Sequence, residues 1–159
     1  MFADPLVERL ADFIRGIGID VRPAQLPGPT FLPGLEIKDG AIFVDELRLA
    51  YPGDLLHEAG HLAVTDPAER HAAQLMPSDG EEIAAQAWSY AAVRHLGLEP
   101  EIVFHSGGYH GSSETLINLF NTGGTFGQPL LQWYGMTFEP RLAAENGVPP
   151  FPHMLRWLR

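Results

Sequence analysis

The chain has 159 residues, a length that typically forms one domain with a substantial hydrophobic core. Its 20 acidic and 10 basic residues give a net charge of -10, which disfavours nucleic acid and anionic membrane surfaces as partners. Because the chain contains no cysteine, thiolate metal ligands and cysteine nucleophiles are excluded, and any metal must be bound by His, Asp or Glu. The sequence begins without a signal-peptide pattern and has no apolar run of about 18 residues, so we expect one cytoplasmic domain over residues 1–159.

The first predicted element is an amphipathic helix near the N-terminus. Asp4 and Pro5 have the residue types of an N-cap and a first helical position. Apolar residues then recur at spacings of three and four as far as Ile17, which predicts a helix with one buried face. Gly16 and Gly18 are expected to end this helix.

A proline-rich connection and a β-hairpin are expected next. Residues 23–33 contain several prolines and predict an irregular segment packed against the domain. Residues 35–37 alternate between apolar and polar types, and residues 41–44 are apolar and partly β-branched, as is typical of strands. Asp39 and Gly40 between them form one of the strongest hairpin-turn signals.

Helical patterns dominate the rest of the chain. Two longer helices are predicted over residues 52–64 and 79–96, and Gly97 is expected just after the second. Shorter helical pieces are expected over residues 113–120, 130–134 and 154–159. A hairpin followed by packed helices predicts an α+β fold, in which the two longer helices lie beside a small sheet and short helices follow towards the C-terminus.

Residues 57–61 read His-Glu-Ala-Gly-His, the H-E-x-x-H pattern, inside the first of the two longer helices. His57 and His61 are four residues apart and therefore share one face of the helix, where both imidazoles can bind the same ion. The surrounding residues are apolar, and burying two histidines and a carboxylate is costly unless they have a partner. The pattern therefore predicts a metal site, with Glu58 beside the ion as a general base.

Two histidines leave a catalytic zinc site incomplete, since such sites usually have three protein ligands. The next helix offers Glu81 and Glu82 near its start. Ser78 and Glu81 fit a capping box, which would give Glu81 a structural role. We therefore favour Glu82 as the third ligand and keep Glu81 as the alternative. Gln86 lies one turn after Glu82 and is a candidate hydrogen-bond partner of that carboxylate.

These residues resemble a known group of enzymes. H-E-x-x-H followed one helix later by a glutamate is similar to the gluzincin metallopeptidases, and the strand pair directly before the motif resembles the small ImmA/IrrE-type metallopeptidases. The alanine-rich segment 82–88 is similar to the second helix of that family, which carries the glutamate. The resemblance covers roughly residues 35–97. It implies a zincin-like fold with zinc as the metal, and it implies that a strand, here residues 41–44, pairs with an extended peptide.

Several aromatic and histidine residues outside the motif are further candidates. His105 and Tyr109 lie in a glycine-rich stretch, where either side chain could approach the metal and stabilise an oxyanion; an ordinary surface loop is the equal alternative. Trp88, Trp133 and Trp157 are expected to pack in the core or between helices.

The expected function is zinc-dependent hydrolysis of peptide bonds in a peptide or protein substrate. In this interpretation His57, His61 and Glu82 bind one zinc ion per chain. Glu58 removes a proton from a metal-bound water and later passes it to the leaving amine. The alternative is a metal-stabilised binding or regulatory module without turnover, since the chain is small and has no evident substrate domain.

Overall fold

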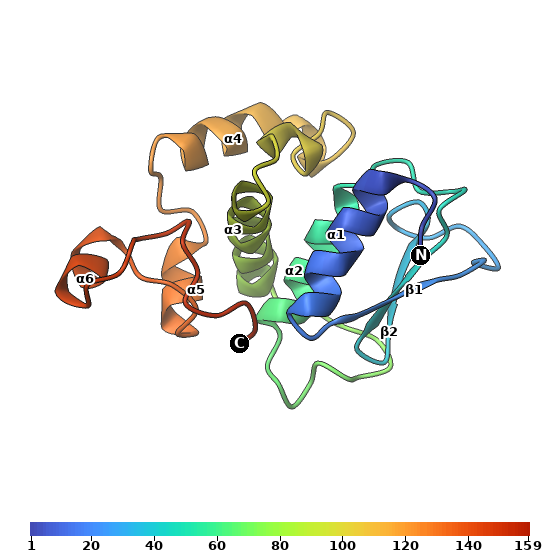
Figure 1. Ribbon diagram of the computed structural model, residues 1–159, viewed down its shortest axis with the longest axis horizontal. Coiled ribbons are helices and arrows are strands. Elements are labelled where there is room, and N and C mark those ends of the chain that lie inside the picture. The colour runs from blue at the N-terminus through green and yellow to red at the C-terminus, as the bar shows by residue number, and fades with distance from the viewer.

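The computed structural model describes residues 1–159, except for the side chain of His110, and has a mixed α+β architecture (Figure 1). Helices pack beside a small three-stranded sheet, so the predicted fold class is confirmed. None of the helices in these described residues has the length and apolar composition needed to cross a membrane. The elements in chain order are α1 (Pro5–Gly16), β1 (Asp20–Pro23), β2 (Leu35–Lys38), β3 (Ala41–Val44), α2 (Asp54–Val64), α3 (Asp79–His95), the 3-10 turns η1 (Pro100–Ile102) and η2 (Tyr109–Gly111), α4 (Ser113–Asn121), α5 (Gln128–Trp133) and α6 (Pro140–Glu145).

Two helices begin where their capping residues predict. In α1 the Asp4 carboxylate accepts a hydrogen bond of 2.7 Å from the backbone N–H of Leu6. In α3 the Ser78 hydroxyl accepts from the Glu81 N–H, and the Glu81 carboxylate accepts from the Ser78 N–H at 2.9 Å. This reciprocal pair is the predicted capping box, and it fixes the direction in which the first turn of α3 presents its carboxylates.

The sheet has the strand order β1-β3-β2. The predicted hairpin is confirmed, because β2 and β3 pair antiparallel with Ile37 opposite Ile42. β1 was not predicted from the sequence, and it pairs parallel with β3 on the opposite side. β3 therefore has a neighbour on both sides, and the expectation that residues 41–44 pair with an extended substrate is wrong. β1 carries one buried residue, Val21, in four, so its sequence has no alternation to reveal it.

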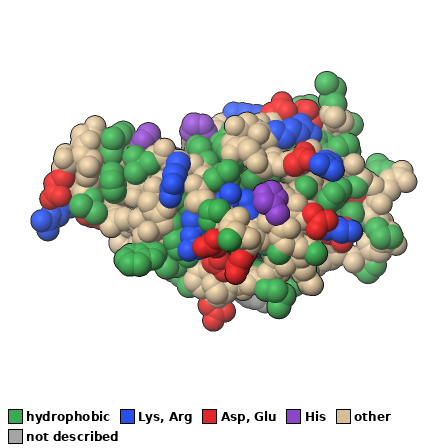
Figure 2. All heavy atoms as spheres, turned by 90° about the horizontal axis from the view of Figure 1, so that it is seen from below, with side chains coloured by type: hydrophobic (Ala, Val, Ile, Leu, Met, Phe, Trp, Pro, Cys, Tyr) green, Lys and Arg blue, Asp and Glu red, His purple; other side chains and the backbone are tan. Residues whose placement is uncertain are grey.

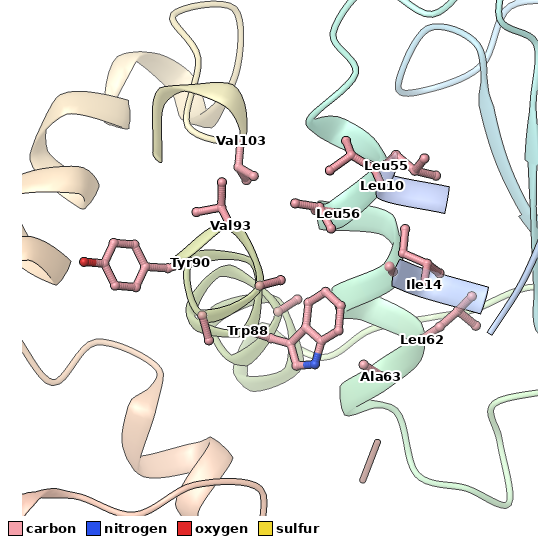
Figure 3. Packing of buried hydrophobic residues seen from close by; sticks show 14 of the residues in the cluster. Leu10, Ile14, Leu55, Leu56, Leu62, Ala63, Trp88, Tyr90, Val93 and Val103 are labelled. Carbon is pink, nitrogen blue, oxygen red and sulfur yellow. The ribbon is translucent and has the colours of Figure 1, made fainter. Parts of the chain in front are cut away.

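Helices α2 and α3 pack against each other at the centre of the molecule (Figure 3). Leu56 on α2 and Trp88 on α3 are fully buried between them, and α1 covers the other side of α2 with Leu10 and Ile14. The sheet lies on the α1 side of this pair, and α5 packs on α3 from the opposite side. The centre of the fold is therefore helical, with the sheet at its edge.

Gly60 allows α2 and α3 to approach closely. A Cβ atom at this position would lie 2.9 Å from the carbonyl oxygen of Ala85 and 3.2 Å from the hydroxyl oxygen of Ser89. Ser89 also donates a hydrogen bond of 3.4 Å to the carbonyl of Leu56, one turn earlier on α2. These contacts show that the two helices run antiparallel, and that the glycine inside H-E-x-x-H is required by packing.

The C-terminal third differs from expectation in three places. Trp133 is 84% exposed at the end of α5 and does not pack in the core, whereas Trp88 and Trp157 do meet, with ring centroids 5.5 Å apart. Residues 154–159 are not helical and instead lie along the central helices, where the Trp88 indole N–H donates to the carbonyl of Trp157 at 3.0 Å. The short helix α6 was not predicted. The long-range contacts that hold such short segments leave no local pattern in the sequence.

We predict that Gly60→Ala lowers the free energy of unfolding by about 1–3 kcal/mol, because the added methyl group meets backbone in a closely packed interface. Gly16→Ala is the matched control, since Gly16 is also helical and a Cβ there has nothing within 4 Å. Urea denaturation of both variants measures the difference. Equal effects of the two substitutions would show that the helix contact at Gly60 is not tight.

Candidate metal centre

Three side chains from α2 and α3 converge on one point. The Nε2 atoms of His57 and His61 are 3.0 Å apart, and each faces the carboxylate of Glu82. The distances from Glu82 are 3.6 Å to His57 Nε2 and 3.1 Å to His61 Nε2. The three ligand atoms lie within 4.8 Å of one another, so this group could hold a metal ion.

Helix geometry explains why these residues meet. His57 and His61 occupy successive turns of α2 and point to the same side. Because α3 runs antiparallel to α2 and lies close at Gly60, its first turn brings Glu82 opposite His61. Glu81 is held by the capping box, and the structure thus places the two neighbouring glutamates as the sequence analysis expected.

The carboxylate and one imidazole have additional partners. The Gln86 amide donates a hydrogen bond of 3.2 Å to Glu82 Oε1, as its spacing suggested. The Tyr109 hydroxyl lies 3.1 Å from His57 Nδ1, and the two rings meet edge to face. If His57 Nε2 is a ligand, Nδ1 carries the proton and donates to the tyrosine oxygen, an arrangement typical of metal-bound histidine. Among the described side chains, none is a hydrogen-bond partner for the buried Nδ1 of His61.

The pKa values of Glu82 and His57 suit a cation. The hydrogen bond from His61 lowers the pKa of Glu82 to about 2, so this carboxylate is ionised near neutral pH. Burial lowers the pKa of His57 to about 4, which keeps its imidazole neutral. Burial also opposes charge on His61, but the hydrogen bond to Glu82 and the charges of nearby glutamates raise its pKa overall. An anionic oxygen ligand and a neutral nitrogen ligand are thus formed in advance, whereas the raised pKa of His61 makes proton release part of metal binding there.

Glu58 lies next to this group without belonging to it. Burial raises the pKa of Glu58 to about 7, and the negative charges of Asp54 and Glu82 act in the same direction. A carboxyl group with this pKa exchanges a proton readily near neutral pH, which is the property required of a general base.

A second polar pair joins the start of α2 to the segment between η1 and η2. His105 Nε2 is 2.6 Å from Asp54 Oδ1, and the His105 ring stacks on Tyr51 with centroids 3.7 Å apart. Asp54 was missed by the sequence analysis, although it precedes Glu58 by four residues and so shares its face of α2. Burial raises the pKa of Asp54, while the hydrogen bond to His105 opposes that rise.

The two residues suggested as oxyanion donors, Tyr109 and His105, each have a protein partner. Tyr109 contacts His57, and His105 contacts Asp54. The backbone of Tyr109 has a φ of 56°, in the left-handed region that is uncommon for a residue with a side chain. Such strain is typically maintained where a side chain must occupy one defined place.

A comparison with protein-family models, with curated proteins and with solved structures finds no match for this chain. The geometry of the site therefore carries the functional argument. Two imidazole nitrogens and one carboxylate oxygen are the donor set of catalytic zinc sites, and they leave a coordination position for water or substrate. The residues present thus fit a divalent transition-metal ion.

We predict that Glu82→Ala weakens zinc binding by more than about 100-fold, since it removes the only charged ligand of the described group. Glu81→Gln is the matched control, because glutamine preserves the capping box while removing the neighbouring charge. Competition with a chromogenic chelator gives both affinities. If Glu81→Gln loses the metal and Glu82→Ala keeps it, the ligand assignment is wrong by one residue.

We predict that Tyr109→Phe weakens zinc binding by about 10–100-fold, because His57 loses the hydroxyl that orients its ring. Phenylalanine fills the same space, so the fold is retained. Tyr90→Phe is the control, since that hydroxyl donates to Asn121 away from the site. Unchanged zinc affinity in the Tyr109 variant, measured by the same competition, would show that the hydroxyl does not position the ligand.

Proposed function

We propose that this protein is a zinc-dependent hydrolase that cleaves peptide bonds. The observation that carries the proposal is the position of Glu58, a partly buried carboxyl group next to His57 on α2, beside three side chains that converge as metal ligands. A structural metal site needs only its ligands, whereas a hydrolytic site also needs a proton acceptor next to the ion. The H-E-x-x-H helix supplies the proton acceptor and two of the three ligands, and α3 supplies the third.

Zinc bound by His57, His61 and Glu82 would supply a Lewis acid that polarises a carbonyl group and makes water more acidic. Glu58 accepts a proton from the attacking water and donates it to the departing amine. The pKa of about 7 that burial gives Glu58 suits both directions of this transfer near neutral pH. Its position one residue after His57 places its carboxyl group about 100° around the helix, so it flanks the ligands.

Other residues of the chain keep this machinery in position. Tyr109 orients the His57 ring through Nδ1, and Gln86 holds one oxygen of Glu82. Asp54, which pairs with His105, lies one turn before Glu58 on α2, and its negative charge helps to raise the pKa of Glu58. We assign Tyr109 and Gln86 to positioning, because each contacts a proposed ligand.

We predict that Glu58→Gln retains about one zinc ion per chain and reduces peptide hydrolysis by about 10²–10⁴-fold, since glutamine keeps the size of the side chain and removes its basicity. Metal content by mass spectrometry and cleavage of an unstructured peptide library give the two readouts. Glu101→Gln, which changes an exposed carboxylate elsewhere, is the control for the loss of one charge.

Two results would contradict the proposal. Hydrolysis by Glu58→Gln at the wild-type rate would show that Glu58 is not the base. A zinc-loaded wild type that cleaves no peptide of the library would favour the metal-stabilised binding module without turnover.

A further inference from the structure

A cavity of about 300 Å³ has no role in the chemistry described above, and its lining includes Glu81, the sequence neighbour of Glu82, and Thr65, which follows His61 by four residues. Its walls come from the end of α2, the loop that connects α2 to α3, and the first turn of α3. Thr65 and Glu81 form the helical walls, Glu69 lies on the loop, and apolar atoms of Leu75, Met76 and Pro77 complete the lining. The volume equals that of about ten water molecules, so it can accept one long side chain.

The cavity continues the line of the metal ligands along α2. His57, His61 and Thr65 follow one another at intervals of four residues and therefore share one face, about 6 Å apart along the axis. On the opposite wall, Glu81 directly precedes Glu82. An extended peptide advances about 3.3 Å per residue, so the cavity lies one or two residues from a bond held at the metal.

The chemistry of the lining is amphipathic. Apolar side chains form one part, and the carboxylates of Glu69 and Glu81 form another. One oxygen of Glu81 accepts the capping hydrogen bonds, and the other lies 3.9 Å from a guanidinium nitrogen of Arg159. Glu69 is exposed, and among the described cations none lies within 4.0 Å of its carboxylate. Glu69 is thus the less compensated of the two charges.

The charge of the wider molecule is also negative. Figure 2 views the molecule from the side on which the 65–78 loop lies in Figure 1, and it shows a group of acidic side chains near the middle of this face, with Lys and Arg side chains beside it. The chain as a whole carries a net charge of -10. A negative field around a negatively lined cavity attracts cationic ligands and repels anionic ones.

We infer that this cavity is a specificity subsite that binds the lysine or arginine side chain of a peptide substrate. The inference rests on the proposed function, because it assumes that a peptide lies across the metal ligands. Lysine and arginine have an apolar stem that fits against Leu75, Met76 and Pro77, and a charged end that reaches Glu69. An aliphatic side chain would desolvate the two carboxylates without pairing them, and an acidic one would meet like charges.

The first experiment measures binding, so that it does not depend on turnover. Fluorescent peptides of one length that differ at a single central position, Arg, Lys, Gln, Leu or Glu, are titrated by anisotropy into zinc-loaded Glu58→Gln protein. We expect the Arg and Lys peptides to bind at least about tenfold more tightly than the Gln peptide. The Glu69→Gln substitution, added to the same protein, should remove most of this preference, and Glu81→Gln should remove a smaller part.

Charge reversal provides the second test. Glu69→Lys places a cation at an exposed loop position, so folding is unaffected, and the preference should turn towards the Glu peptide. Glu114→Gln and Glu101→Gln remove exposed carboxylates outside the cavity and should leave the preference unchanged. The inference is overturned if no peptide binds, if all peptides bind equally, or if the basic preference survives in the Glu69→Gln, Glu81→Gln double variant.

Cleavage by the wild type separates this inference from the proposed function. Selective cleavage one or two residues from a basic side chain supports both the peptidase and the subsite. Tight, Glu69-dependent binding of basic peptides without cleavage supports the subsite and contradicts the peptidase. Cleavage with no preference for basic residues supports the peptidase and contradicts the subsite.

Discussion

The close contact between α2 and α3 at Gly60 is the constraint on which the site depends. The ligands come from different helices, and their distances of 3.1 and 3.6 Å to Glu82 can exist only if the backbones approach closely. A side chain at position 60 would meet the carbonyl of Ala85 and would separate the first turn of α3 from the histidines. The packing of α2 on α3 and the convergence of the three ligands therefore both require a residue without a side chain at position 60.

The candidate site also contains acidic groups whose burial lowers the stability of the fold. Glu58 and Asp54 are acidic groups in an apolar helix, and burial raises the pKa of each. Burying such groups lowers the stability of the fold unless hydrogen bonds or counter-charges compensate. Asp54 has His105 as a partner, whereas Glu58 keeps a pKa of about 7. The left-handed backbone conformation of Tyr109, whose hydroxyl contacts His57, also lowers the stability of the fold.

Local patterns in the sequence were enough to predict the elements that build the metal centre. The spacing of His57 and His61 and the capping box at Ser78 are encoded within a few residues, so the motif helix, the start of α3 and the choice between Glu81 and Glu82 follow from them. The α+β class follows from the hairpin and the two longer helices. Zinc, and the catalytic role of Glu58, stay predictions.

Contacts between segments that are far apart in the chain could not be predicted from local sequence patterns. β1 is recognised only by its pairing with β3, and without it residues 41–44 look like an edge strand. Asp54 is recognised as part of the site only by its contact with His105, which lies 51 residues away in the sequence. Trp133 shows that a large apolar side chain at the end of a short helix is not necessarily in the core.

The unequal exposure of the three ligands has a kinetic consequence. The side chain of Glu82 is 41% exposed, whereas those of His57 and His61 are 12% and 9% exposed. If an ion binds as proposed, a hydrated cation arriving from solvent meets the carboxylate first, and the imidazoles replace its water molecules afterwards. Release would follow the reverse order, with Glu82 as the last contact of a departing ion. The rates at which such an ion enters and leaves would therefore both depend on this one accessible residue.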